Sequence, residues 1–394
     1  MNKRLLGFSL VELMVAMVVA LVTVYAIFQV FGGYEGQKRV TVGIGNAESN
    51  GKNALYLLER DIRQAGFGLT NSATANCLYI YGNSTTFAQT YSPIPATIVD
   101  PNTTSSPRLP VSIYVRYGSS VVGGATTAVT IPMPNPSAEI NVSSTNDIMV
   151  NDIVLGVTGN QCAVMQITHV QATPGKIQHD PNSGTINPAS GNFVSGSSGA
   201  PASFPGLVAG DSIVDLGQAP DVTQYSIQYS SASGQGSAQD PVLQLLQLSG
   251  PNASATATPL IDNIISVQAQ YGVAQPNVNQ NNVVCWTNAV DNSSNNTAAP
   301  CDQNWSSSTL TPVLAKQIKA IRIAILARSP IPAKPQSNGQ CTATSVMPYL
   351  PWPDGSSYDQ FDVSENGAIT NWKCYRYKVF STVIPLRNVL WANM

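Results

Sequence analysis

The sequence predicts an α+β protein, in which one long N-terminal α-helix packs on a β-rich globular head with long loops. Two observations predict this fold. Residues 8–31 form a nearly continuous apolar run, and apolar residues then recur at helical spacing as far as Ala65. After Gly68 the chain changes to short β-rich runs separated by Pro, Gly, Ser and Asn.

The apolar run follows a short basic leader with Lys3 and Arg4 and is about 24 residues long. At about 1.5 Å per residue, a helix of this length crosses a bilayer core of roughly 30 Å. Its only carboxylate, Glu12, lies near its start, and a carboxylate costs up to about 2.5–3.5 kcal/mol at mid-bilayer depth and less towards the interface. A secretory signal peptide has a shorter apolar region with an A-x-A-like cleavage site, so we expect an anchor instead.

The second half of the predicted helix, residues 32–66, is amphipathic. Its expected buried face is made of Val40, Ile44, Ala47, Ala54, Leu58, Ile62 and Ala65. Gly66 and Gly68 mark the expected end of the helix. Glycines between residues 32 and 45 weaken the junction of the two halves, and we expect any local melting on assembly to centre on them.

The head, residues 67–394, contains β-rich runs and two long polar stretches. The polar stretches, residues 173–205 and 275–304, are rich in Gly, Asn, Ser and Pro and are predicted to be surface loops. The predicted strands are Cys77–Tyr81, Val111–Tyr117, Ala128–Ile131, Asp147–Val157, Ala163–Val170, Thr223–Tyr229, Val242–Leu248, Ile264–Tyr271, Ile318–Ala327 and Tyr375–Ile384.

Composition and charge narrow the class of protein. Only 10% of the 394 residues are charged, whereas a typical soluble domain has roughly 25%. The net charge of −2 is unevenly distributed. Residues 1–63 have 7 basic and 5 acidic side chains, residues 64–315 have 3 basic and 12 acidic ones, and residues 316–394 have 9 basic and 4 acidic ones. The middle of the chain is therefore acidic and both ends are basic. A charge-poor, Ser/Thr/Asn-rich chain is typical of exported bacterial proteins. The lack of a basic run argues against a dedicated nucleic-acid binder.

The six cysteines are widely spaced and form no C-x-x-C pair, so the sequence favours disulfides over a zinc or iron–sulfur site. Six cysteines allow 15 pairings, and the sequence alone does not choose among them. We favour Cys285–Cys301, which would close a loop of about 16 residues, and Cys341–Cys374, with Cys77–Cys162 as the remaining pair.

Catalytic and metal-binding patterns are weak. There is no G-x-S-x-G elbow, His169 is expected in a strand or at its edge, and His179 is expected to be solvated in a loop. We therefore expect no enzymatic activity and no cofactor. A Pro/Gly/Ser-rich segment holds four carboxylates of the kind that calcium prefers, but it lacks EF-hand spacing and is expected to be an ordinary acidic loop. These four residues are Asp354, Asp359, Asp362 and Glu365.

Basic residues near the C-terminus alternate in part along a predicted strand. They are Lys373, Arg376, Lys378 and Arg387. The simple interpretation is a solvated strand face. The alternative is that this face meets an acidic surface on a neighbouring subunit or on the acidic middle region of the same chain.

The start of the apolar run resembles a known processing signal. Gly7-Phe8-Ser9-Leu10-Val11-Glu12, after a basic leader, is similar to the site of type III signal sequences in type IV prepilins and type II secretion pseudopilins. The resemblance implies that residues 1–7 are a leader, that prepilin peptidase cuts after Gly7, and that the new amino group of Phe8 is methylated. It also makes Glu12 the fifth mature residue.

The position of Glu12 also suits a contact between neighbouring helices. Four helical residues separate it from Phe8, which is about 6 Å of rise, so a neighbouring helix shifted by about one turn could set its ammonium group against this carboxylate. Removing one partner of such a buried pair costs roughly 3–5 kcal/mol. Glu12 is therefore expected to set the register between packed helices.

Several stretches of the head resemble PilW-type minor pilins. They are Leu57–Gly66, Asp147–Val157, Ala163–Thr168, Leu260–Val273, Ala320–Ser329 and Tyr377–Asn388. The resemblance implies a protein without catalytic activity that primes type IV pilus assembly at or near the pilus tip and so serves twitching motility or cell adhesion. The implied partners are other minor pilins, the major pilin, prepilin peptidase and a tip adhesin, and no specific nucleic acid is expected.

The same resemblance implies a location and two alternatives. Before assembly the chain would lie in the bacterial inner membrane, with residues 8–31 as a single-pass helix and the head in the periplasm, and afterwards in the pilus at the cell surface. One alternative is a J-type minor pseudopilin of a type II secretion system. The other is a tip adhesin or ligand-binding module that uses the polar loops.

Overall fold

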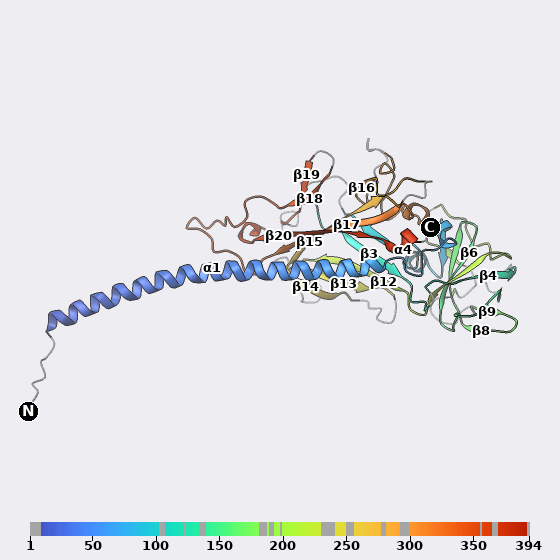
Figure 1. Ribbon diagram of the computed structural model, residues 1–394, viewed down its shortest axis with the longest axis horizontal. Helices are drawn as coiled ribbons and strands as arrows, with labels where there is room; N and C mark the ends of the chain where they lie inside the picture. The colour runs from blue at the N-terminus through green and yellow to red at the C-terminus, as the bar shows by residue number, and fades with distance from the viewer. Residues whose placement is uncertain are drawn as a thin grey trace, which may run out of the picture.

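The computed structural model describes residues 9–101, 107–121, 123–133, 139–180, 187–188, 193–197, 199–229, 241–249, 256–276, 281–291, 299–354, 357–364 and 369–391. In this part of the chain, one long N-terminal helix runs into a head that is built mainly of β-sheets (Figure 1). This arrangement confirms the predicted α+β fold class.

Helix α1, Leu10–Gln64, is 55 residues long and starts from Ser9. The Ser9 hydroxyl accepts a hydrogen bond from the Val11 N–H, and the Ser9 N–H donates to Glu12 Oε2 at 3.0 Å, which forms a capping box. The helix stays continuous through its glycines between residues 32 and 45. Its N-terminal half projects from the molecule, whereas its C-terminal half lies along the head (Figure 1).

The end of α1 matches the sequence prediction. Gly66 and Gly68 have φ values of 82° and 67°, which L-residues with a side chain rarely adopt, so the chain turns there. The side-chain amide of Asn388 donates to the carbonyls of Gln64 at 3.2 Å and Ala65 at 3.0 Å. These bonds satisfy carbonyl groups that a helix terminus otherwise leaves open.

A four-stranded antiparallel sheet covers one side of the embedded half of α1. The order across it is β16 (Cys285–Thr287), β15 (Ile264–Val273), β17 (Ile318–Arg328) and β20 (Tyr377–Pro385). Every residue of β15 is buried, because one face of the sheet packs on α1 and the other lies under the β18–β19 hairpin.

A five-stranded antiparallel sheet covers a second side of α1, and its strands β12, β13 and β14 are labelled below the helix in Figure 1. Its order is β14 (Thr258–Asp262), β13 (Val242–Gln247), β12 (Asp221–Gln228), β3 (Ser112–Tyr117) and β2 (Ala96–Val99). One hydrophobic core joins both sheets to the helix through Ala47, Ala54, Leu58 and Ile62. The helix is thus part of the core of the head.

A nine-stranded sheet forms the end of the head that lies farthest from the N-terminus (Figure 1). Separate hydrophobic clusters pack on it, which explains why strands such as β6 are buried almost throughout. In spatial order its strands are β10 (Val194–Ser195), β1 (Tyr79–Gly82), β7 (Gln161–Gln166), β6 (Ile153–Thr158), β11 (Ser212–Gly217), β4 (Thr126–Ile131), β5 (Ile140–Val142), β9 (Lys176–Gln178) and β8 (His169–Gln171).

Short elements complete the head. The hairpin β18–β19 (Tyr349–Asp354 and Ser357–Gln360) covers the four-stranded sheet, and α4 (Arg387–Trp391) contacts α1. The others are α2 (Thr85–Thr90), α3 (Pro312–Ala315) and the 3₁₀ turns Thr74–Asn76 and Trp372–Cys374.

Several local expectations were wrong. The predicted loops at residues 173–205 and 275–304 contain strands β9, β10 and β16, which are short and so leave little periodic signal. The strand predicted from Asp147 begins only at Ile153, because Asp147 and Asn151 adopt positive φ and turn the chain. His179 is buried, at 3% exposure, with its ring 6.2 Å from that of Phe193, and is not solvated.

Candidate functional site

The exposed half of α1 is an unusual surface for a protein in water. Apolar side chains from Leu10 to Phe31 are about half to three-quarters exposed. Within the described residues, α1 is the one helix that is long and apolar enough to cross a membrane, judged by length and composition. The 22 residues from Leu10 to Phe31 span about 33 Å at 1.5 Å per residue, close to the hydrocarbon thickness of a bilayer. Such a surface needs lipid or partner helices around it.

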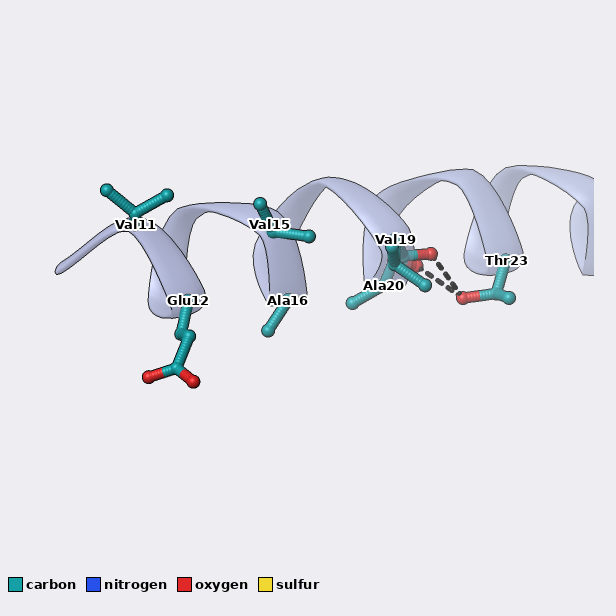
Figure 2. Close-up of a pocket in the computed structure, with 7 residues that line it drawn as sticks. All are labelled: Val11, Glu12, Val15, Ala16, Val19, Ala20 and Thr23. Carbon is teal, nitrogen blue, oxygen red and sulfur yellow. Dashed lines mark hydrogen bonds between the residues drawn. The ribbon is translucent and has the colours of Figure 1, made fainter. Parts of the chain in front are cut away.

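Glu12 lies at the start of this apolar half. Figure 2 shows its carboxylate pointing away from the helix, on the same side as Ala16, whereas Val11 and Val15 point to the other side. Its Oε2 accepts the Ser9 N–H at 3.0 Å. Gly7 and Phe8, the predicted cleavage and methylation residues, lie outside the described residues. The carboxylate is therefore placed next to the backbone that leads to the predicted cleavage site.

Small side chains follow Glu12 along its own face of the helix. Ala16 and Ala20 follow it at intervals of four residues, and residues four apart lie on one helix face. Thr23 continues near this face, and its hydroxyl donates to the carbonyls of Val19 at 2.8 Å and Ala20 at 2.9 Å (Figure 2). Small residues let two helices in lipid approach closely, and this hydroxyl is satisfied within its own helix.

The embedded half of α1 meets strand β20 and its neighbours through small residues. Gly43, Ala47, Gly51 and Ala54 are all buried. A Cβ atom on Gly51 would lie 2.1 Å from Cε2 of Phe380, and a Cβ atom on Gly43 would lie 3.3 Å from Cβ of Ser329. Phe380 of β20 thus leaves no room for a side chain at position 51, and Ser329, directly after β17, leaves little room at position 43.

The buried face of α1 therefore differs in part from its sequence prediction. Ala47, Ala54, Leu58, Ile62 and Ala65 are buried as expected. Val40 is only partly buried and Ile44 is 38% exposed. Ile44 lies beside the buried line of small residues that begins at Gly43, and not on it. The hydrophobic pattern missed the two glycines, although small residues at positions 43, 47, 51 and 54 follow helical spacing and could have indicated the seam.

A charged contact ties β20 to the exposed side of α1. Lys378 Nζ lies 2.9 Å from Glu48 Oε2, and Lys52 Nζ lies 2.7 Å from Glu48 Oε1. Hydrogen bonds from the two ammonium groups lower the pKa of Glu48 to about 2. One of the basic C-terminal residues thus contacts an acidic residue of α1 in the same chain, a partner that lies outside the acidic middle region.

A buried carboxylate ties α1 to the five-stranded sheet. Asp61 is 6% exposed, accepts a short hydrogen bond from the Tyr225 hydroxyl of β12, and pairs with Arg60 Nε at 2.6 Å. Burial, together with the neighbouring Asp61 charge, raises the pKa of Tyr225 well above its usual range. The phenol therefore stays a donor to Asp61. Sequence pattern did not reveal this contact, because nothing near Asp61 indicates a partner 164 positions away.

The three disulfides join Cys77 to Cys162, Cys285 to Cys301, and Cys341 to Cys374. These are the three pairs that the sequence favoured. Cys77–Cys162 links β7 to the chain before β1, and Cys341–Cys374 links the segment after β17 to the chain before β20. These two disulfides therefore fix loops to the sheets. Disulfide bonds are typical of proteins outside the cytoplasm.

The predicted calcium residues have other partners where the structure describes them. Asp359 Oδ2 lies 2.6 Å from Arg108 Nε, and Asp362 Oδ1 accepts the Ser364 N–H at 2.8 Å and its hydroxyl at 2.7 Å. Glu365 and the Asp354 side chain lie outside the described residues. Among the described positions, no group of three His, Cys, Asp or Glu residues is arranged to hold a metal ion.

The two histidines lie at neighbouring positions of the paired strands β8 and β9, because His169 is opposite Gln178, but their side chains differ in burial. His169 is exposed on the edge strand β8, as expected, whereas His179 is buried just after β9. The described geometry thus brings together an exposed apolar helix, a carboxylate at its start and a tightly packed helix–head seam. Each of these features is a packing surface or borders one.

Comparison with known proteins agrees with this picture. The family described as Type IV Pilus-assembly protein W matches residues 224–388, which run from β12 through the four-stranded sheet to α4. Searches of curated proteins and of solved structures found no match. The family match supports a type IV pilus-related protein that takes part in pilus assembly and interacts with other assembly components.

Proposed function

We propose that this chain is a minor pilin that co-assembles with other minor pilins, primes type IV pilus assembly and sits at or near the pilus tip. The observation that carries the proposal is the exposed apolar half of α1, which begins at Glu12 and continues without a break into the core of the head. The family match in the head supports the same system. The role is one of binding, without catalysis.

The proposed order of events begins in the membrane. Residues 10–31 hold the chain in the bilayer, and prepilin peptidase cuts after Gly7 and methylates the amino group of Phe8. In the filament, neighbouring helices replace lipid around the apolar half of α1. The stripe of Ala16 and Ala20 beside Glu12 lets a helix come close (Figure 2).

Glu12 would then set the register between subunits. Its carboxylate already accepts the Ser9 N–H, so it lies beside the backbone of the mature N-terminus. In apolar surroundings, the ammonium group of a neighbouring Phe8 is a better partner than a neutral amide. A helix displaced from this pairing would leave a charge buried without a partner, at a cost of roughly 3–5 kcal/mol.

The test is to replace Glu12 by Gln in the full chain and to measure the protein in sheared pili and in membranes. Glu12→Gln keeps the size of the side chain and removes its charge, so we expect normal cleavage and membrane level but at least a tenfold loss from pili. Glu59→Gln is the matched control, because Glu59 is a partly exposed carboxylate of the same helix that lies outside the apolar half and pairs with Arg63. Normal incorporation of Glu12→Gln would refute the register role.

A further inference from the structure

A groove lies where α1 leaves the head. It has a volume of about 590 Å³ and is bounded on one side by residues 32–40 of α1 and on the other by residues 329–334, here called the 329–334 arm. Three basic side chains line it, from Arg39, Lys334 and Arg376, together with the carboxylate of Glu35. The groove is therefore positively charged overall.

The charged side chains of the groove are not paired with one another. Within the described residues, neither Glu35 nor any of the three basic side chains forms an ion pair, although Glu35 and Arg39 are four residues apart on one helix. The Nε atom of Arg376 is buried and has no hydrogen-bond partner there. A buried guanidinium nitrogen without an acceptor is costly, so an external acceptor would stabilise it.

The walls of the groove are held in place. Two hydrogen bonds join Arg376 and Ser329. The Ser329 N–H donates to the Arg376 carbonyl at 2.8 Å, and the Arg376 N–H donates to the Ser329 side-chain hydroxyl at 3.1 Å. The Ala333 N–H donates to the Cys374 carbonyl at 2.6 Å, and Cys374 is bonded to Cys341. The arm is thus fixed to the start of β20, and the groove is built before any ligand arrives.

The position of the groove on α1 indicates what fills it. The groove begins at Gly32, directly after the apolar run that ends at Phe31, and exposed Tyr34 lies at the same level. The polar interface of a bilayer occupies about 5–7 Å on each side, and Tyr is enriched there. Glu35 lies about 6 Å beyond Phe31 along the helix, and helical side chains such as that of Arg39 lean back towards the N-terminus.

We propose that this groove binds the phosphodiester of an anionic phospholipid headgroup while α1 spans the membrane, an inference that rests on the membrane-anchored stage of the proposed function. The guanidinium groups of Arg39 and Arg376 and the ammonium group of Lys334 bind the phosphate oxygens, since Arg pairs with phosphate through two parallel N–H bonds. Glu35 accepts hydrogen bonds from headgroup hydroxyls. The bound lipid fixes the height of the head above the bilayer.

The experiment measures lipid binding to the full chain, purified in a neutral maltoside detergent, by native mass spectrometry. Phosphatidylglycerol, phosphatidylethanolamine with the same acyl chains, and inorganic phosphate are titrated separately. We expect phosphatidylglycerol to bind at least fivefold more tightly than phosphatidylethanolamine. We expect inorganic phosphate, which lacks the acyl chains, to compete only weakly.

Variants separate the groove from general attraction to the membrane. A basic residue near an anionic surface contributes roughly fivefold in affinity, so Arg39→Gln should weaken phosphatidylglycerol binding about fivefold, and Arg39→Gln with Lys334→Gln about 25-fold. Lys38→Gln is the matched control, because Lys38 is exposed next to Arg39 but does not line the groove. It should change binding less than twofold. Both groove side chains are exposed, so these variants keep the fold.

Three results would overturn the proposal. Equal binding of the two lipids would remove the preference for an anionic headgroup, and equal effects of Lys38→Gln and Arg39→Gln would indicate unspecific attraction. Loss of Arg39→Gln protein from pili with unchanged lipid binding would make the groove a protein contact. None of these results bears on Glu12, because its role is tested by incorporation of the protein into pili. Failure of the lipid-binding proposal is therefore distinguishable from failure of the proposed pilin function.

Discussion

The contact between Gly51 and Phe380 gives the sharpest test of how α1 is held by the head. A Cβ atom on Gly51 would lie 2.1 Å from Cε2 and 2.4 Å from Cδ2 of the Phe380 ring, well inside van der Waals contact. In Gly51→Ala, the ring must turn away or α1 must move away from β20. Overpacking of this kind costs about 1–3 kcal/mol.

The same substitution has an opposing effect on the helix itself. Ala is favoured over Gly in a helix interior by about 0.8–1 kcal/mol, which reduces the net loss to about 0–2 kcal/mol, with a central value near 1. Gly45→Ala is the matched control, because Gly45 lies on the same helix with no atom within 4 Å of its Cβ position. Gly45→Ala should gain only the higher helix propensity of Ala, and this variant should be more stable than the wild type.

Hydrogen–deuterium exchange of the full chain measures this balance locally. We expect amides between residues 44 and 58 to exchange about fivefold faster in Gly51→Ala and more slowly in Gly45→Ala, since about 1 kcal/mol corresponds to a factor of about five. Phe380→Leu combined with Gly51→Ala should restore part of the protection. If Gly51→Ala were as protected as Gly45→Ala, the close approach of β20 to α1 would be wrong.

Three further predictions concern the buried and charged contacts of the head. Tyr225→Phe should lower the free energy of unfolding by about 1.5–3 kcal/mol, because Asp61 loses a buried donor. An unchanged urea unfolding curve would show that the pair with Arg60 alone satisfies Asp61. Asp152 is 1% exposed and burial raises its pKa to about 6, above its usual value of 3.8, so the folded state binds the proton more tightly than the unfolded state. The free energy of unfolding should therefore fall as pH rises from about 4 to about 6. Asp152→Asn should flatten this part of a profile of melting temperature against pH. An unchanged profile would contradict the raised pKa of Asp152. Lys378→Gln should leave the melting temperature nearly unchanged at high salt, because the Glu48 pair is exposed and screened, and a large loss there would show that the pair is more than a surface contact.

Local patterns in the sequence were sufficient for the elements that bury one regular face. The apolar run, the amphipathic half of α1, its end at Gly66, and strands such as β15 and β17 were all predicted, since period and propensity act within each segment. Short strands such as β9 and β16 were missed. They are three residues long and take their strand conformation from pairing with longer neighbours, which a local pattern does not contain.

By itself, the sequence determined that this chain has a long helix with an apolar half, a carboxylate at its start and a disulfide-rich β head, because length, periodicity and residue type decide these features locally. The tertiary structure alone decided which residues meet. It brought Phe380 against Gly51, Tyr225 against Asp61, and the 329–334 arm against α1. These contacts join segments far apart in the chain, and only the packing of α1 between two sheets brings them together.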